Sequence, residues 1–259
     1  MKIGVIGFGY VGKALAEGLK ISGNHKIFVN DKVPAKSQST LEELARGTEL
    51  IFVCVQTPTL HDGTQDLTNI LQVAEELNTL QLKVPPIIIK STVLPGTCKM
   101  LNHKYNPRLR FSSSPEFFRQ QKALEDFLSP DRIVIGTDYP DVYSLFCSVF
   151  KKLGPIVKTD SSTAEFIKYA SNVFLVYKVA FALEMSRYAS ELNVQGDVAL
   201  EAVGMDSRIG SSHLDPFVGK IPVYSPCLPK DFRAFKKLVA DSVGYSKLLE
   251  VTEEISLEK

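Results

Sequence analysis

The chain has 259 residues, of which 44% are apolar and 23% charged, and its net charge is +1. This length and composition indicate a globular protein with a real core, divided into two domains of ordinary size rather than one. The near-zero net charge excludes the strongly basic surface expected of a protein that binds nucleic acid or an anionic membrane.

The cysteines and the N-terminal sequence indicate in which cellular compartment the protein is located. The four cysteines are widely scattered, without the spacing of a metal site or a disulfide framework: Cys54, Cys98, Cys147 and Cys227. The four histidines form no cluster either, so we predict no metal. The N-terminal MKIGVIGFGYVG is typical of a strand and turn rather than a signal peptide, and we expect no apolar run of membrane-spanning length. A reducing cytoplasm is the simplest location.

Short β-branched runs alternate with amphipathic stretches over the first 158 residues. Strands that alternate with helices predict parallel βαβ units and a doubly wound, mostly parallel sheet. The helical patterns include residues 10–22, 67–80 and 141–153. The expected strands are residues 2–7, 26–31, 50–55, 85–92, 108–114, 132–137 and 155–159.

The pattern changes after residue 158. Residues 161–194 contain no Gly or Pro, and their apolar residues recur at helical spacing, which predicts one helix of about thirty residues. Its apolar content exceeds one stripe, so we expect it to be sandwiched within its own chain or between two copies. The remainder is helical with loops. The predicted fold is an α/β domain over residues 1–158, followed by an all-helical domain over residues 159–259.

A glycine motif follows the first expected strand and opens the first expected helix. In Gly7-Phe8-Gly9-Tyr10-Val11-Gly12, the first glycine permits a tight turn, the second brings bare backbone close to a pyrophosphate, and the third lets the helix pack near the strand. Asp31 ends the second expected strand, where a carboxylate accepts from ribose hydroxyls and disfavours a 2′-phosphate. Lys36 lies nearby and weakens that preference. The motif predicts a Rossmann-type domain that binds NAD.

Polar residues follow the later strands and recur on the long helix. Ser91 and Thr92 lie at the carboxyl end of the fourth expected strand, and Glu116 follows the fifth, at the sheet edge where open α/β folds bind ligands. Lys168 and Asn172 are four residues apart, so both project from one helix face. Taken alone, that face has a plainer interpretation. Glu165 lies three residues before Lys168, which is also the spacing of an ordinary Glu–Lys ion pair.

The stretch CLPKD places a thiol, an amine and a carboxylate together at Cys227, Lys230 and Asp231. One interpretation is a loop bounded by Pro226 and Pro229, with Asp231 capping the next helix. The other is a nucleophile beside its electrostatic partners.

Seven motifs, taken in order, resemble the UDP-glucose and GDP-mannose 6-dehydrogenase family. They cover the chain from Met1 to about residue 250. The motifs are GFGYVG, VCVQTPT, KSTVLPGT, SPEFFRQQKALEDFLSPDRIVIG, EFIKYASNVFLVYKVAFALEMS, DSRIG and CLPKD. The resemblance implies oxidation of a primary alcohol of a sugar nucleotide to the carboxylate, with two hydride transfers to NAD.

The resemblance also implies roles for individual residues. Cys227 would attack the aldehyde of the first step and form a thiohemiacetal, then a thioester. Lys168 and Asn172 would donate to the oxyanion, and Asp231 would serve as base or hold a water. Thr92 and Glu116 would position the hydrolytic water. Thr57, Thr92 and Gln120 are the further expected contacts to the cofactor, and the expected contacts to substrate are Glu116, Phe117, Lys168, Asn172, Arg208 and Lys230. The long helix would form a homodimer interface.

The sequence departs from the family in three places. Family members carry a further nucleotide-binding domain after the helical one, and by this comparison the present sequence would lack it. The loop before Cys227, HLDPFVGKIPVYSP, has one glycine where the family loop is glycine-rich, and backbone approaches a ligand less easily without glycine. Gln120 replaces the second acid of the family's PEFxxE motif.

Two alternatives remain open on sequence grounds. One is a two-electron NAD-dependent alcohol or hydroxyacid dehydrogenase acting on a smaller substrate, which would need Lys168 but not Cys227. The other is an NAD-binding protein without turnover that lends its site to a partner chain.

Overall fold

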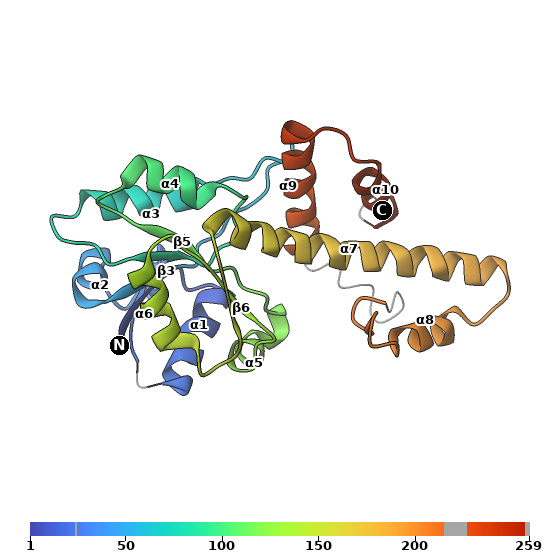
Figure 1. The fold of residues 1–259 in the computed structure, drawn as a ribbon, viewed down its shortest axis with the longest axis horizontal. Helices are drawn as coiled ribbons and strands as arrows, with labels where there is room; N and C mark the ends of the chain where they lie inside the picture. The colour runs from blue at the N-terminus through green and yellow to red at the C-terminus, as the bar shows by residue number, and fades with distance from the viewer. Residues whose placement is uncertain (24, 215–226, 257–259) are drawn as a thin grey trace. The chain divides into compact units, whose positions relative to one another are not determined.

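A computed structural model describes residues 1–23, 25–214 and 227–256. The chain divides into two compact units. The first contains Met1–Pro58 and Gln65–Lys168, and the second contains Thr59–Thr64 and Tyr169–Lys259. The long helix α7, Ser161–Glu191, belongs to both, since the division falls at Lys168 (Figure 1).

The first unit is a seven-stranded sheet in the order β2-β1-β3-β4-β5-β6-β7. Neighbouring strands are parallel except β5 and β6, which pair antiparallel through Ser113 and Gly136. The predicted Rossmann-type, mostly parallel sheet is confirmed, with a strand in each of the seven expected stretches. The strands are β1 Lys2–Ile6, β2 Lys26–Asn30, β3 Leu50–Val53, β4 Ile87–Ile89, β5 Phe111–Ser113, β6 Ile133–Gly136 and β7 Ile156–Thr159.

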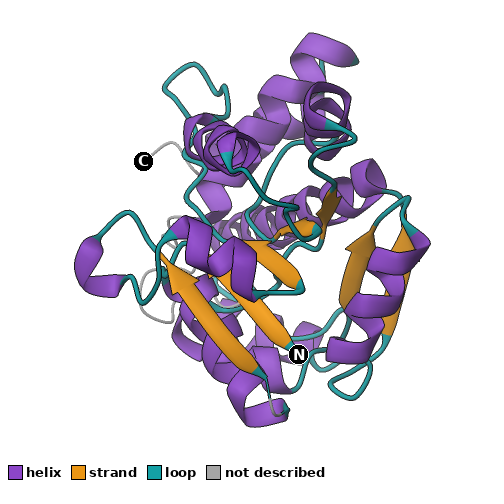
Figure 2. Ribbon diagram, turned by 90° about the vertical axis from the view of Figure 1, so that its left-hand side faces the viewer, coloured by secondary structure: helices purple, strands orange, loops and turns teal. Residues whose placement is uncertain are grey.

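Helices cover both faces of this sheet (Figure 2). The strand β4 shows why its run of three isoleucines forms a central strand. Ile87 and Ile89 pack in one core cluster, with residues of α2, α3 and α4, whereas Ile88 packs in the other, with residues of α1, α5 and α6. The helices are α1 Tyr10–Ser22, α2 Leu41–Gly47, α3 Thr68–Thr79, α4 Thr97–Tyr105, α5 Ala123–Leu128 and α6 Pro140–Phe150, with short 3-10 turns at Pro34–Lys36 and Gln120–Lys122.

Apart from the turn at Thr59–Thr64, the described part of the second unit consists of helices and their connections. Besides α7 it contains α8 Gly196–Gly204, α9 Cys227–Ser242 and α10 Lys247–Ser256. One cluster joins α7, α9 and α10 through Val173, Val176, Leu228, Phe232 and Leu249, and a smaller one joins α7 to α8. The expectation of a single helix of about thirty residues is confirmed, since α7 has 31 residues.

Two details differ from expectation. The interpretation of CLPKD as a loop that ends in a helix cap is wrong, because Cys227 and Pro229 lie in α9 and Asp231 is buried within that helix. The expectation that no apolar run reaches spanning length is wrong for α7, which holds an 18-residue window of mean hydropathy 1.3. That is weak evidence for a membrane span, because core helices of soluble proteins meet the same criteria, and 44% of the window is buried. The altered loop before Cys227 lies mostly outside the described residues.

Candidate functional site

The glycine motif forms a tight turn between β1 and α1. Gly7 has φ +92°, and a Cβ there would lie 2.8 Å from the carbonyl carbon of Cys54. A Cβ on Gly12 would lie 2.0 Å from the carbonyl oxygen of Gly7, so only glycine lets the helix pack this close. Gly9 differs, because a Cβ there would meet nothing within 4 Å. Gly9 therefore offers open backbone at the helix N-terminus, as a pyrophosphate site requires.

Asp31 lies beside this turn at the end of β2. One carboxylate oxygen accepts from the amide of Phe8 over 2.6 Å, and the other from the amide of Val33 over 2.8 Å. An ionised carboxylate has about four lone-pair sites, so each oxygen still has capacity for a ribose hydroxyl. Lys36 is exposed, and Tyr10 and Val11 open α1. The residues of this edge fit a dinucleotide.

Hydrogen bonds join the loop that follows β3 to the loop that follows β4. The hydroxyl of Thr57 donates to the carbonyl oxygen of Thr92 over 2.6 Å. Gln65 donates its side-chain amide to the same carbonyl over 3.0 Å and accepts from the amide of Leu94 over 2.9 Å. These bonds fix the backbone of Thr92 at the carboxyl end of β4.

Glu116 and Lys168 form an ion pair in the first unit. The ammonium donates to one carboxylate oxygen over 3.1 Å, and both side chains are about nine-tenths buried. The other carboxylate oxygen accepts from the amide of Phe118 over 2.6 Å. The ring of Phe117 lies beneath two cations, with its centroid 5.6 Å from the Lys168 ammonium and 4.0 Å from the Arg132 guanidinium carbon.

Glu165 is not the partner of Lys168. Its buried carboxylate accepts from the backbone amides of Gly96 and Cys98 at the start of α4, over 2.7 and 2.9 Å. Burial raises the pKa of Glu165, and these backbone hydrogen bonds partly offset the rise. The plain Glu165–Lys168 ion pair is therefore wrong, and Lys168 is directed to Glu116.

In the second unit, Asn172 and Asp231 join α7 to α9. The Asn172 amide donates to one oxygen of the Asp231 carboxylate over 2.7 Å, and Lys230 donates to the other. Asp231 is 1% exposed and Asn172 6% exposed, whereas Lys230 is half-buried. The backbone carbonyl of Lys230 accepts from the hydroxyl of Thr59 over 3.0 Å. A buried carboxylate with a donor on each oxygen is held in one orientation.

Cys227 is the first residue of α9 and is half-buried. Lys230 and Asp231 follow it by three and four residues, so the three side chains share one side of the first helical turns. The unpaired backbone amides at the start of a helix favour negative charge on a group placed there. The motif CLPKD predicts that these residues lie together, but it does not predict that Cys227 begins a helix.

Two predicted residues make no hydrogen bond or ion pair with these groups among the described residues. Gln120 is exposed and opens the 3-10 turn after Glu116. Arg208 is exposed and pairs with its near neighbour Asp206. Among the described residues, no group of three or more His, Cys, Asp and Glu side chains is arranged to hold a metal ion.

Gln65 and Lys90 are buried polar residues beside these groups that the sequence pattern did not predict. Lys90 immediately follows β4 and is 4% exposed. Its ammonium donates to the hydroxyl of Ser114 and the carbonyl of Pro115, each over 3.2 Å. The available signal was a lysine directly after a run of three isoleucines.

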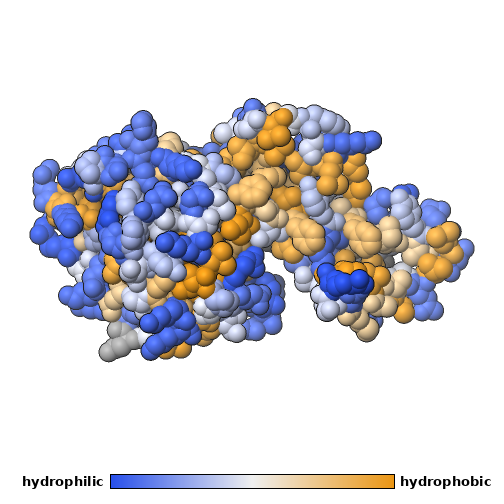
Figure 3. Space-filling model, viewed as in Figure 1, coloured by the Kyte–Doolittle hydropathy of each residue, from blue (hydrophilic) through white to orange (hydrophobic). Residues whose placement is uncertain are grey.

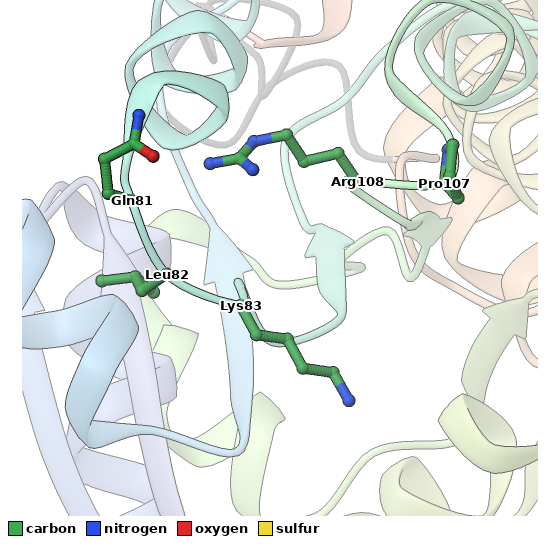
Figure 4. A pocket seen from close by; sticks show the side chains of 5 residues that line it. All are labelled: Gln81, Leu82, Lys83, Pro107 and Arg108. Atoms are coloured by element: carbon green, nitrogen blue, oxygen red, sulfur yellow. The ribbon is translucent and has the colours of Figure 1, made fainter.

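A surface hollow lies at the other end of the strands (Figure 4). It is lined by residues that precede β4 and β5, namely Gln81, Leu82, Lys83, Pro107 and Arg108. The glycine turn and Thr92 follow their strands, so this hollow is not part of the dinucleotide edge.

Comparison with known proteins covers both units. Residues 35–154 match the NAD-binding domain of the UDP-glucose/GDP-mannose dehydrogenase family, and residues 162–256 match its central domain. The first match begins after the glycine turn and Asp31, so the geometry of that edge is independent support for a dinucleotide site.

Individual proteins agree with the family match. The chain is 33% identical to a UDP-glucose 6-dehydrogenase of Rickettsia bellii over 231 residues, which are 86% of this chain and 52% of the relative. It is 30% identical to a UDP-glucose 6-dehydrogenase of Haloferax volcanii, with 99% of this chain and 69% of the relative covered. A UDP-glucose dehydrogenase structure from Pyrobaculum islandicum superposes with a TM-score of 0.85 at 29% identity, covering 98% of this chain and 67% of that one.

The chain thus spans about half to two thirds of the length of these proteins. Within that span both matched domains occur in the same order, each on the unit whose geometry suits it. The chain belongs to the UDP-glucose/GDP-mannose dehydrogenase family.

Proposed function

We propose that this chain catalyses the NAD-dependent oxidation of the primary alcohol of a sugar nucleotide to the carboxylate. One observation carries the proposal: a half-buried thiol, Cys227, lies one helical turn from a buried carboxylate, Asp231, whose oxygens are both held by donors. A buried carboxylate costs free energy even when it is paired, so retaining one beside a thiol at a helix start favours chemistry over packing.

The overall reaction has a fixed balance. One alcohol and one water give one carboxylate, two hydrides and three protons. Bound NAD supplies the hydride acceptor for each oxidation. The glycine turn would hold the pyrophosphate at Gly9, and Asp31 would hold a ribose.

Cys227 would trap the intermediate between the two oxidations. After the first hydride has left the alcohol, the sulfur adds to the aldehyde carbon and gives a thiohemiacetal. Loss of the second hydride leaves a thioester, and attack by water releases the carboxylate and the thiol. The start of α9 suits this role because it favours an anionic sulfur.

The polar residues would each have a separate role in the reaction. Lys168 and Asn172 supply N–H donors one helical turn apart on α7, suited to the oxygen that gains negative charge at the reacting carbon. Asp231 would accept the proton of the alcohol or of the water. Thr92 and Glu116 would position that water. Phe117, Lys230 and Arg208 would contact the substrate, and Thr57 and Gln120 the cofactor.

We further propose that the chain forms a homodimer through α7. Three large side chains on this helix are exposed at seven-residue intervals: Phe174 at 61%, Phe181 at 45% and Tyr188 at 40%. Such a repeat marks one continuous face that a second helix can cover. Apolar surface is visible over the helices of the second unit (Figure 3). The family resemblance favours a second copy of the chain as the partner that covers this face of α7.

A cytoplasmic location agrees with four free cysteines and with a soluble sugar-nucleotide substrate. The net charge of +1 favours neither nucleic acid nor an anionic membrane as a partner. The experiment for the proposed activity follows NADH formation by the purified chain with NAD and a panel of alcohols. The panel contains UDP-glucose, GDP-mannose, UDP-N-acetylmannosamine and hexose phosphates that carry no nucleotide.

A further inference from the structure

Lys90 lies at the centre of the sheet and contacts the segment that carries Glu116. It directly follows β4, the middle strand of seven, and it is 4% exposed. Its ammonium donates to the hydroxyl of Ser114 and to the carbonyl of Pro115, each over 3.2 Å. It also lies 5.9 Å from the ring centroid of Phe118. The contacts of Lys90 therefore flank Glu116 on both sides in the sequence.

Burying the Lys90 ammonium lowers the stability of the fold. Its two hydrogen-bond acceptors are neutral, and burial lowers its pKa from 10.5 to about 8. Lysine is almost never fully buried unless it is paired, and replacing buried charge with well-packed apolar side chains is often neutral or stabilising. Stability of the sheet alone gives no reason for a lysine here.

The charged and titratable groups around Lys90 come from three elements. Cys54 follows β3, Glu116 follows β5, and Lys168 lies on α7. The charges of Cys54 and Glu116 favour the ammonium, and that of Lys168 opposes it. Burial raises the pKa of the Cys54 thiol to about 12, so this neighbour is neutral at physiological pH. Glu116 is then the anion that the ammonium faces.

We propose that Lys90 is a positioning residue that holds the segment 114–118 so that the carboxylate of Glu116 meets Lys168. The inference rests on the proposed function, in which Glu116 and Lys168 act on the substrate and its water. The neutral amine has one N–H fewer and no charge to attract Glu116, so deprotonation above pH 8 weakens the hold. Turnover should therefore decline on the alkaline side as Lys90 loses its proton.

The experiment compares Lys90→Met, which keeps an unbranched side chain without charge, with Lys90→Arg, which keeps a cation. Ser112→Ala is the matched control: it removes a buried hydrogen bond to Thr137 from β5, and Ser112 is not a hydrogen-bond partner of Lys90 or Glu116. The readouts are kcat and KM for the alcohol between pH 6 and 10, the Kd for NAD, and the crystal structures of the parent protein and of Lys90→Met.

We expect Lys90→Met to lower kcat on the order of 10- to 100-fold, as loss of an outer-shell partner does at metal sites, with an unchanged Kd for NAD. Lys90→Arg should restore part of kcat and remove the alkaline decline near pH 8, because a guanidinium stays charged. Ser112→Ala should keep the parent pH profile. An unchanged kcat and alkaline decline in Lys90→Met overturns the inference. If Lys90→Met does not fold, Ser114→Ala replaces it, with a smaller loss of kcat expected and an unchanged kcat overturning the inference.

Failure of the proposed function gives a different result. If the parent chain oxidises none of the alcohols, the positioning role is tested only by comparing the crystal structures of the parent protein and of Lys90→Met. An ion pair of Glu116 with Lys168 that is broken in Lys90→Met supports the positioning role. An ion pair that keeps the parent separation of 3.1 Å overturns it.

Discussion

Asn172 donates a hydrogen bond of 2.7 Å to Asp231, and this bond joins α7 to α9 between two buried side chains. Lys230 occupies the other oxygen of the carboxylate, so Asp231 has a fixed orientation in the second unit. Glu116 has a similar arrangement in the first unit, with Lys168 on one oxygen and the amide of Phe118 on the other. Each unit thus holds a buried, oriented carboxylate whose side-chain partner lies on helix α7, Lys168 for Glu116 and Asn172 for Asp231.

Asn172→Ala should both destabilise the chain and impair turnover. The change leaves one oxygen of the buried Asp231 carboxylate without its donor, at a cost of about 1–3 kcal/mol in the free energy of unfolding. Urea unfolding and kcat measure the two effects. Asn69→Ala is the control, since that amide donates to a backbone carbonyl in an exposed setting. Equal unfolding midpoints and equal kcat for the two variants would show that the Asn172–Asp231 bond has no role.

Cys227→Ser separates the covalent mechanism from simple alcohol oxidation. A serine hydroxyl at neutral pH is a far weaker nucleophile than a thiolate, so the variant should stop after the first oxidation or lose turnover. Lys168→Ala should lower activity under either mechanism. Full conversion of the alcohol to the acid by Cys227→Ser would rule out the thioester. One NADH per alcohol from both the parent chain and Cys227→Ser, with none from Lys168→Ala, would indicate the two-electron class instead.

Gly9→Ala tests the cofactor edge without disturbing the fold. A Cβ at this position meets nothing within 4 Å, and Gly9 has a φ of −78°, which alanine adopts freely. The thermal midpoint should therefore be unchanged, while the Kd for NAD rises about tenfold or more, equivalent to about 1.4 kcal/mol. Calorimetric titration with NAD measures the change. An unaltered Kd would mean that the pyrophosphate does not approach Gly9.

The stability difference between the parent chain and Lys90→Met should depend on pH. The pKa of Lys90 is lower in the folded chain, about 8, than its ordinary 10.5, so between these values the unfolded chain binds more protons. The parent should therefore gain stability relative to Lys90→Met as pH rises from about 8 to 10.5, by roughly 3 kcal/mol at most. Burial raises the pKa of Cys54, which destabilises the fold above pH 9 in both proteins. Because the ammonium of Lys90 partly offsets that rise, the difference reports Lys90 together with its effect on Cys54. Urea unfolding at pH 7, 8.5 and 10 measures it, and a difference that stays constant or falls contradicts the expected titration.

Replacing Phe174 and Phe181 together with Asp should give a monomer. Both side chains belong to the exposed face of α7, and burying two carboxylates against a second copy is strongly unfavourable. Met205→Asp is the control, because Met205 is 75% exposed on a different part of the second unit. Light scattering at micromolar concentration reports the mass. A parent chain that is already monomeric, or a double variant that stays dimeric, would contradict a dimer formed through α7.

The strands could be predicted from sequence because each is a short run of apolar or β-branched residues bounded by turns. Residues 87–89 are all β-branched and follow two prolines, which favours a short buried strand, and in the structure they alternate between two buried faces. Helix α1 could be bounded at both ends, since Gly9 and Gly23 flank it. Such elements can be predicted from sequence because residues close in the chain determine their backbone conformation.

The partners of the polar side chains could not be predicted in the same way. Glu165 and Lys168 have the spacing of an ion pair, yet Glu165 turns to the amides at the start of α4 and Lys168 to Glu116. Those choices depend on which loops follow the neighbouring strands, a tertiary property. Lys90 could not be identified for the same reason, because its hydrogen-bond partners Ser114 and Pro115 follow the neighbouring strand β5. The family resemblance supplied roles for Cys227 and Asp231 but did not place Cys227 at the start of a helix.

The number of NADH molecules formed per molecule of UDP-glucose or other panel alcohol consumed tests the central proposal most directly. Purified parent chain with excess NAD should give two NADH per alcohol and release the carboxylic acid, because Cys227 carries the aldehyde into a second oxidation. One NADH per alcohol, with aldehyde as product, would contradict the four-electron reaction. No NADH from any alcohol of the panel, with NAD binding measured separately, would contradict the proposed activity itself.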